Sequence, residues 1–233
     1  MPHMVITGAS RRLGLFLTEQ FLLADWRVTA ITRSPSDALL GLAQSNLRLV
    51  SADYSHTENF AALVQEIGED AIDLLFHNAS YFAPDADETS EALDQMDQML
   101  KTHVALPMFL NNALTGQLKQ SANANIIHMT DIYVDNPNSR FSHYCASKAA
   151  LENLSKSFAK RLAPEVRVNS IQPGALKFLP EHSDAAKQAV LSAALIQQEA
   201  GFEPIYQTIQ FILNNPFITG TAIKVDGGRS ICR

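Results

Sequence analysis

Residues 4–14 have the sequence MVITGASRRLG, in which a short apolar run leads into a loop that contains Gly8 and Gly14. A glycine at the end of a strand permits a tight turn, and a second glycine lets the following helix pack closely on the sheet. The first turn of that helix offers unpaired N–H groups to a pyrophosphate. This stretch therefore predicts a strand, a dinucleotide-binding turn and a helix, although an ordinary glycine-containing loop remains the alternative for the motif taken alone.

Short apolar runs alternate with longer amphipathic segments along the rest of the chain, which is typical of parallel βαβ units. Strands are predicted at Met4–Thr7, Arg27–Thr32, Leu47–Ala52, Ile72–His77, Asn125–Met129, Arg167–Gln172 and Ala222–Val225. Helices are predicted from about Leu13 to Ala24 and near Thr57–Ile67, Ser90–Thr115, Ser142–Ala163 and Pro204–Asn214. We expect an α/β protein with a Rossmann-type, doubly wound, seven-stranded parallel sheet and helices on both faces. It should form a single domain over residues 1–233, with a substrate lid around 175–203.

The composition narrows the classes of partner. Eighteen Lys and Arg against 24 Asp and Glu give a net charge of −6, so the chain lacks the basic surface that nucleic-acid binding requires. With 46% hydrophobic and 18% charged residues, the chain can bury a large core, which excludes disorder as its main state. We therefore expect a folded protein with no nucleic-acid partner.

Targeting and metal signals are missing from the sequence. No run of about 18 apolar residues occurs, and Met1 is followed directly by the strand-like Met4-Val5-Ile6 without a signal-peptide pattern. The two cysteines, Cys145 and Cys232, form no CxxC pair and no Cys/His spacing that indicates a metal. The expectation is a cytoplasmic protein without membrane association and with a metal-free mechanism.

Basic residues near the predicted turn favour one nicotinamide cofactor over the other. Arg12 stands where many dinucleotide-binding folds have a middle glycine, and Arg11 precedes it, so two guanidiniums could hold phosphate oxygens. The second strand ends in Arg33-Ser34, where an Asp or Glu would bind the ribose diol of NAD. A cation beside a hydroxyl suits a 2′-phosphate, so NADPH is the expected cofactor. The alternative that Arg33 is a solvated surface residue stays open.

Tyr144 and Lys148 lie four residues apart in a predicted helix and so share one face. A nearby ammonium favours phenolate and is expected to lower the tyrosine pKa from about 10, which would make the phenol a usable proton donor to a substrate reduced by hydride. A Tyr and a Lys four residues apart are common on surface helices, so this spacing indicates a catalytic site only together with other motifs.

Further motifs follow the predicted strands. Asp53-Tyr54 follows the third, His77-Asn78-Ala79-Ser80 the fourth, and Pro173-Gly174 the sixth. In this order, with the glycine loop and the Tyr144/Lys148 pair, the chain resembles the short-chain dehydrogenase/reductase family over essentially its whole length. The resemblance implies a homo-oligomer, a tetramer in this family. It also implies that the cofactor is bound by Gly8, Ser10, Arg11, Arg12, Leu13, Gly14, Arg33, Ser34, Asp53, Tyr54, Asn78, Ala79, Ser80, Thr130, Tyr144, Lys148, Pro173 and Gly174.

Two departures from the general family pattern narrow the resemblance. The family's serine lies 13 residues before the tyrosine, where this chain has Asp131, and His103 replaces a helix-borne asparagine. Asp131, Arg12 in place of the middle glycine, and an aromatic residue soon after Ser80 are similar to the pteridine reductase-like branch. That branch implies NADPH-dependent reduction of a 7,8-dihydropterin, with hydride added to C6 and a proton to N5.

The resemblance also implies roles for individual residues. Asp131, Tyr144 and Lys148 would be catalytic, because a carboxylate can accept from a pterin N–H group or relay a proton with Tyr144. The substrate-binding set is Arg12, Ser80, Phe82, Asp131 and Tyr144, with the pterin stacked on Phe82. His103 has two open readings, one as the holder of a relay water and the other as a satisfied core histidine.

The sequence is also compatible with two other functions. The chain could be a reductase of the same fold that acts on a ketone, imine or enone, or a non-catalytic NADP(H)-binding regulator. The intact Tyr144/Lys148 pair counts against the regulator, since sensing needs the nucleotide site and not a proton donor. Among pterins, dihydromonapterin, dihydrobiopterin and dihydrofolate are all open. The sequence shows no evident cation for a glutamate tail, which favours unconjugated dihydropterins.

Overall fold

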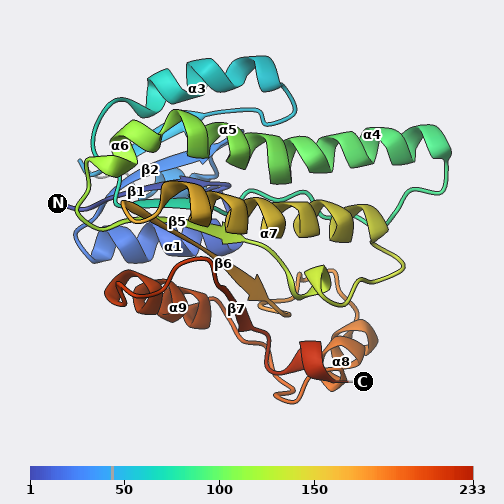
Figure 1. Cartoon of the computed structure of the whole chain (residues 1–233). Coiled ribbons are helices and arrows are strands. Elements are labelled where there is room, and N and C mark those ends of the chain that lie inside the picture. Colours follow the sequence, from blue (N-terminus) through green and yellow to red (C-terminus); the bar gives the residue numbers. More distant parts are fainter. Residues whose placement is uncertain (43–44, 233) are drawn as a thin grey trace.

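One seven-stranded sheet runs through the centre of the computed structural model, which describes residues 1–42 and 45–232 (Figure 1). The strand order is β3-β2-β1-β4-β5-β6-β7, and every neighbouring pair is parallel. The strands are β1 (His3–Thr7), β2 (Arg27–Thr32), β3 (Leu47–Ser51), β4 (Leu74–His77), β5 (Ala124–Met129), β6 (Val166–Pro173) and β7 (Ala222–Val225). The predicted doubly wound parallel sheet is confirmed.

The strand boundaries agree with the predicted ranges to within two residues. β2 and β7 have the predicted limits. The largest difference is at β4, which begins at Leu74 rather than Ile72. The N–H of Ile72 donates to the carbonyl of Gln117, outside the sheet, so this residue does not join the ladder.

The helices are α1 (Arg12–Leu23), α2 (Asp37–Leu40), α3 (Phe60–Ile67), α4 (Thr89–Leu100), α5 (Leu106–Ala113), α6 (Thr115–Lys119), α7 (Ser142–Leu162), α8 (Asp184–Ser192) and α9 (Glu203–Asn214). Short 3₁₀ turns form at η1 (Thr57–Asn59), η3 (Ile132–Val134) and η4 (Arg229–Ile231), and η2 (Lys101–Ala105) is a π-helical turn.

The single helix predicted at Ser90–Thr115 is wrong in one respect, because η2 interrupts it between α4 and α5. Pro107 has no N–H to donate to the carbonyl of His103, four residues earlier, so a regular α-helical ladder cannot continue there. Single π-turns of this kind are frequent at functional sites. The irregular turn places His103 in the buried interior.

Helices cover both faces of the sheet, as predicted. α1 and α9 lie against one face, and α3, α5 and α7 lie against the other (Figure 1). Alternate strand residues serve the two layers: Met4 and Ile6 of β1 pack with α1 and α9, whereas Val5 packs with α3 and α5. Both faces are therefore apolar, which explains why the strands are nearly continuous hydrophobic runs.

The sheet order reverses between β1 and β4, which are neighbours although two further strands separate them in the sequence. Ligands of open α/β sheets bind in the crevice outside the carboxyl ends of the strands at such a switch point. The residues that follow Thr7 and His77 therefore meet where a cofactor site is expected. None of the described helices is both long and apolar enough to span a membrane.

Candidate active site

The loop after β1 has no room for larger residues at its two glycines. Gly8 adopts φ +71°, and a Cβ there would lie 2.8 Å from the Cα of Ala79. A Cβ on Gly14 would lie 2.1 Å from the carbonyl oxygen of Gly8. Arg12, in the place of the usual middle glycine, also has a positive φ of 53°, which is uncommon for a side-chain-bearing residue. The loop therefore keeps a glycine-like backbone path despite the arginine.

Hydrogen bonds fix this loop to its neighbours. The side-chain amide of Asn78 donates to the carbonyls of Thr7, at 3.3 Å, and Gly8, at 3.0 Å. The Ser10 hydroxyl donates to the carbonyl of Ser34 at 2.7 Å. Among the described residues, no side chain caps the N-terminus of α1 and no acidic residue lies in its first turn. The open end of a twelve-residue helix beside a narrow loop suits a phosphate.

The residues predicted to bind the adenosine part of the cofactor lie at the ends of two strands: Arg33 and Ser34 for the ribose phosphate after β2, and Asp53 and Tyr54 for the adenine after β3. Arg33 and Ser34 are exposed. Hydrogen bonds from Ser55 lower the pKa of Asp53, and the charge of Arg33 contributes in the same direction. The cation and the carboxylate therefore lie close enough to influence each other.

The resemblance implies that Tyr54 binds the cofactor, but its hydroxyl is hydrogen-bonded within the protein. Its hydroxyl donates to the carbonyl of Ile31 at 3.0 Å and accepts from the N–H of Gly8 at 3.2 Å. Burial raises the pKa of the Tyr54 phenol. The hydroxyl thus ties the end of β2 to the glycine loop, and the polar end of this residue is used inside the protein rather than facing a ligand.

Asp131 and Tyr144 form a hydrogen-bonded pair at the carboxyl end of β5, in which Tyr144 is buried and Asp131 half-buried. The Tyr144 hydroxyl donates to one carboxylate oxygen of Asp131 at 2.9 Å, and the N–H of Tyr133 donates to the other at 2.9 Å. Burial raises the pKa of the Asp131 carboxyl. Burial, and then the negative charge of Asp131, raises the pKa of Tyr144 well above 10. The phenol is therefore protonated throughout the neutral range.

Lys148 lies beneath this pair, but the expected depression of the Tyr144 pKa is wrong for the protein as it stands. The Lys148 ammonium donates to the carbonyl of Met129 at 2.7 Å and lies 5.7 Å from the centre of the Tyr144 ring. Burial lowers the pKa of Lys148 to about 8. Two effects keep the phenol protonated: its own burial and the negative charge of Asp131. Together they outweigh the attraction of the Lys148 ammonium for a phenolate.

His103 belongs to a hydrogen-bonded chain next to Tyr144. Its Nε2 accepts from the N–H of Tyr81 at 3.1 Å and lies 3.0 Å from the Ser80 hydroxyl, so Nδ1 carries the proton and faces the Ser147 hydroxyl at 2.8 Å. Burial, and then the charge of Lys148, holds the pKa of His103 well below 6.5. Both nitrogens have protein partners, which agrees with the reading of His103 as a satisfied, neutral core histidine.

Phe82 lies at the edge of the pair rather than in the core. Its ring stacks on Phe141 with centroids 4.7 Å apart, meets Tyr144 edge-on at 4.8 Å, and the residue is 56% exposed. An exposed aromatic face next to a buried proton donor can hold a flat heterocycle.

Other predicted residues contribute through their backbones. Leu13 is buried in the core, so only its main chain can face a phosphate. At the end of β6, Gly174 packs so closely on Asp226 that a Cβ would lie 2.8 Å from the Asp226 Cα. The Thr130 hydroxyl donates to Glu152 at 3.0 Å, so its side chain points into the protein and away from the crevice.

Glu152 is a buried polar residue that sequence reasoning missed. One of its carboxylate oxygens accepts from Thr130 and from Ser170, the latter at 2.7 Å. Glu152 stands four residues after Lys148 on α7, so the same helical spacing that selected Tyr144 and Lys148 could have found it.

Arg12 faces the segment predicted as a lid. Its guanidinium donates to the carbonyl of Lys177 and lies 5.9 Å from the centre of the Phe202 ring. The lid range 175–203 holds α8 and is closed on itself by a bond from the N–H of Gly201 to the carbonyl of Leu176. The structure thus connects the glycine loop to both ends of this segment.

Comparisons with known proteins agree with this geometry. Residues 2–189 match the family model described as short chain dehydrogenase. The dihydromonapterin reductase of Klebsiella pneumoniae is 34% identical over 232 residues, which cover 97% of this chain and 96% of that protein. The protein of the same name from an Escherichia coli strain is 35% identical with the same coverage.

Solved structures share the fold. A short chain dehydrogenase family protein from Francisella tularensis superimposes with a TM-score of 0.88 at 22% identity, over 99% of both chains. A 4-hydroxyisoleucine dehydrogenase complexed with NADH superimposes with a TM-score of 0.89 at 21% identity, over the whole of both chains. At this identity, the similarity concerns the fold alone.

Proposed function

The chain belongs to the short-chain dehydrogenase family, and from that premise we propose that it reduces a 7,8-dihydropterin with NADPH. Membership makes it an oxidoreductase that uses a nicotinamide cofactor. The observation that carries the finer proposal is the hydrogen bond, 2.9 Å long, between Asp131 and the buried Tyr144. A simple carbonyl needs one neutral donor, whereas an N5=C6 imine next to ring N–H groups can use a donor paired with an acceptor. The relatives named dihydromonapterin reductase support the same substrate class.

The described residues fit an NADPH molecule. The space against Gly8 and Gly14, where no Cβ can be placed, and the uncapped N-terminus of α1 suit a pyrophosphate. Arg33 and Ser34 are exposed at the end of β2, where a guanidinium and a hydroxyl would hold a 2′-phosphate. Asp53, after β3, would bind the adenine.

Bound NADPH would supply the hydride that is added to C6. The exposed face of Phe82 would orient the pterin by stacking, and the Ser80 hydroxyl, held by His103, lies beside Tyr144 at the same edge. Contacts of this kind fix the angle at which C6 meets its reductant.

Tyr144 would give its proton to N5. The phenol is protonated at neutral pH because burial and the charge of Asp131 raise its pKa, so it has a proton to donate. Proton loss leaves a second negative charge next to Asp131. Lys148, 5.7 Å from the Tyr144 ring, would offset this charge. Asp131 would then take up a proton from solvent and pass it to the phenolate, which restores the donor for the next turnover. General acid catalysis by a positioned side chain typically contributes about 10²- to 10⁴-fold in rate.

The segment 175–203 would act as the substrate lid. Arg12 contacts Lys177 and Phe202, near the two ends of the segment, and could follow it on closure. Exclusion of water at this point strengthens the charge interactions of the Asp131–Tyr144 pair.

A homo-oligomer is part of the proposal. The helices α4 and α5 expose the apolar side chains Leu93, Leu100 and Met108. Exposed apolar side chains along one helical stretch suit packing against a second copy of the chain.

The test is cofactor oxidation by the purified protein with four substrates: 7,8-dihydromonapterin, 7,8-dihydrobiopterin, 7,8-dihydrofolate and a simple diketone, each with NADPH and with NADH. The proposal predicts pterin-dependent oxidation in which NADPH is preferred. Oxidation with the diketone alone would assign the protein to carbonyl reduction. Tight NADPH binding without turnover of any substrate would favour a regulatory role instead.

A further inference from the structure

A cavity of about 510 Å³ lies beside η3, the turn that follows Asp131, and is formed by segments that lie far apart in the sequence. Its walls are η3, the loop 136–138, the end of α8 with the residues that follow it, and η4. These segments gather at one end of the molecule, next to the C-terminus (Figure 1). Asp131 caps η3, because its carboxylate accepts from the N–H of Tyr133, and Tyr133 lines the cavity.

Among the described residues that line the cavity, Arg229 is the only charged one. Its guanidinium donates to the Tyr133 hydroxyl at 3.3 Å, and Asn138 donates to the same hydroxyl at 3.4 Å. Since the oxygen of Tyr133 accepts twice, its own proton is free to point at a ligand. The cavity therefore presents a guanidinium, an amide and a phenol, all of which can donate.

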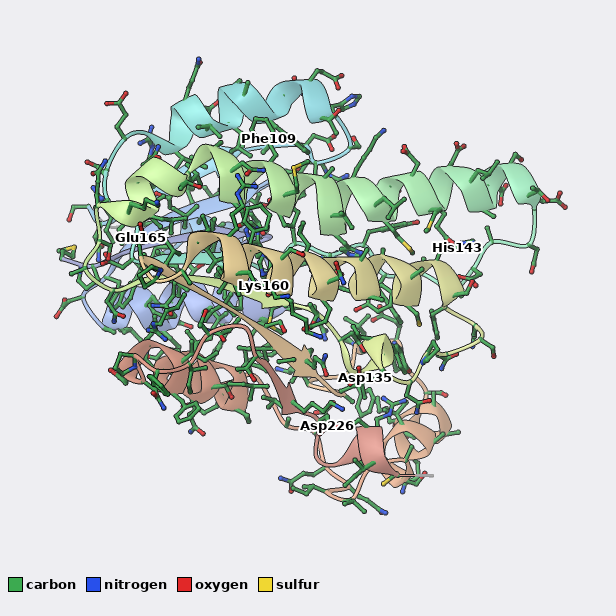
Figure 2. The ribbon with its side chains drawn as sticks, viewed as in Figure 1. Phe109, Asp135, His143, Lys160, Glu165 and Asp226 are labelled. Atoms are coloured by element: carbon green, nitrogen blue, oxygen red, sulfur yellow. The ribbon has the colours of Figure 1, made fainter. Side chains whose placement is uncertain are left out.

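The acidic residues near Arg229 are occupied elsewhere. Asp135 pairs with Lys224 at 2.9 Å, and the Asp226 carboxylate accepts from the N–H groups of Gly228 and Ser230. Figure 2 shows Asp135 and Asp226 at this end of the molecule. No carboxylate lies within 4.0 Å of the Arg229 guanidinium among residues 1–42 and 45–232. A half-buried guanidinium without a carboxylate partner suits an anionic ligand.

The chemistry of the reaction connects this cavity to the substrate. In a dihydropterin, N5 is bonded directly to C6, so a donor that reaches N5 lies close to the group attached at C6. Tyr144 is the proposed donor, and it is hydrogen-bonded to Asp131, the residue before the cavity-lining Ile132 and Tyr133. The charge of Arg229 also acts on Asp131, where it lowers the carboxyl pKa against the stronger effect of burial. Ile132 and Tyr133, the two residues that follow Asp131, line the cavity, so a substituent at C6 could extend toward it from the reacting centre.

We propose that this cavity binds the C6 substituent of the substrate and that Arg229 recognises an anionic group on it. The proposal rests on the proposed function and deepens it, because it names a class of dihydropterin. The anion is the carboxylate of a glutamate-conjugated pterin or the phosphate ester of a polyol side chain. Both are held by the same charge-assisted hydrogen bonds. Arg229 is the specificity-determining residue, and neutral polyol substrates use the cavity without it.

The experiment compares kcat/KM for 7,8-dihydrofolate, the 3′-phosphate of 7,8-dihydroneopterin and neutral 7,8-dihydromonapterin. The variants are Arg229→Gln and Arg229→Lys, with Arg161→Gln as the control because Arg161 lies on α7 and donates to Asn112, away from the cavity. Loss of a hydrogen bond to a charged group predicts that Arg229→Gln lowers kcat/KM about 10- to 100-fold for the anionic substrate. Arg229→Lys should lose less, and dihydromonapterin should change less than about threefold.

The two anionic substrates distinguish a carboxylate from a phosphate, according to which one loses more in Arg229→Gln. An equal change for anionic and neutral substrates would overturn the proposal, as would no change at all. If the wild-type protein oxidises NADPH with dihydromonapterin while Arg229→Gln shows no charge selectivity, only the subsite fails. If no dihydropterin is reduced by the wild-type protein, the proposed function fails as well.

Discussion

Acidification below pH 6.5 is expected to destabilise the protein through histidines that are buried in the neutral form. His77 and His128 stack in parallel with ring centres 4.9 Å apart, and the Asn111 amide hydrogen-bonds to both rings, at 2.8 Å from His77 Nε2 and 3.1 Å from His128 Nε2. Burial lowers the pKa of His77 from 6.5 to about 4, and burial also holds the pKa of His128 well below 6.5. Protonation of either ring would place a charge in the core.

The direction and the size of the stability change with pH follow from the number of protons bound by the folded and the unfolded chain. Between pH 6.5 and about 4, the unfolded chain carries a proton on His77 that the folded protein does not, so stability falls as the pH falls through this window. The whole gap corresponds to about 3 kcal/mol for His77 alone. The carboxylates with lowered pKa values, Asp53 and Asp226, lose their contribution only at more acid pH. Asp131, with a raised pKa, acts in the opposite direction at the acid end.

Urea unfolding of the wild-type protein and of His77→Gln, measured at several values between pH 6.5 and 5, tests this reasoning. Over this range the variant should show a slope of unfolding free energy against pH that is smaller by about 1 kcal/mol per pH unit, because the unfolded chain binds up to one proton at His77 that the folded protein does not. The exposed His182 supplies the control variant, His182→Gln, which should keep the wild-type slope. Equal slopes in wild type and His77→Gln would refute the assignment of a neutral buried His77.

Three substitutions test the site. Tyr144→Phe should lower kcat about 10²- to 10⁴-fold while the Kd for NADPH, measured by fluorescence titration, changes far less; unaltered turnover would remove Tyr144 from the mechanism. Arg33→Ala should weaken binding of NADPH far more than that of NADH, and equal weakening would contradict the 2′-phosphate assignment. Gly14→Ala places a Cβ 2.1 Å from the Gly8 carbonyl and should lower the unfolding free energy by about 1–3 kcal/mol and weaken NADPH binding. The control Gly116→Ala, with nothing within 4 Å, should do neither, and matching effects would argue against a crowded loop.

The fold could be predicted because its strands are apolar on both faces and its first turn is specific. The strands β2 and β7 agree with the predicted limits. The prediction of one continuous helix at Ser90–Thr115 missed the π-helical turn η2. The amphipathic pattern continues through η2, although the hydrogen bonding changes there. Periodicity reports which face is buried and does not report a local change from α to π.

The candidate site could be located by sequence, but not all of its chemistry. Asp131, Tyr144 and Lys148 are brought together by β5 and α7, as motif spacing indicates. The pKa of Tyr144 could not be foreseen, because its sign depends on the balance of burial, carboxylate and ammonium at known distances. Arg229 could not be placed at all, since only the folded chain brings η4 next to η3.

Transfer of a labelled hydride tests the central claim most directly. A single turnover with NADPH carrying deuterium at the transferable position of the nicotinamide, and with 7,8-dihydromonapterin as substrate, is analysed by mass spectrometry and NMR of the product. We predict a tetrahydropterin with one deuterium at C6 and a solvent-derived proton at N5. Failure to form the tetrahydropterin, or its formation without deuterium at C6, would contradict the assignment of this protein as a dihydropterin reductase.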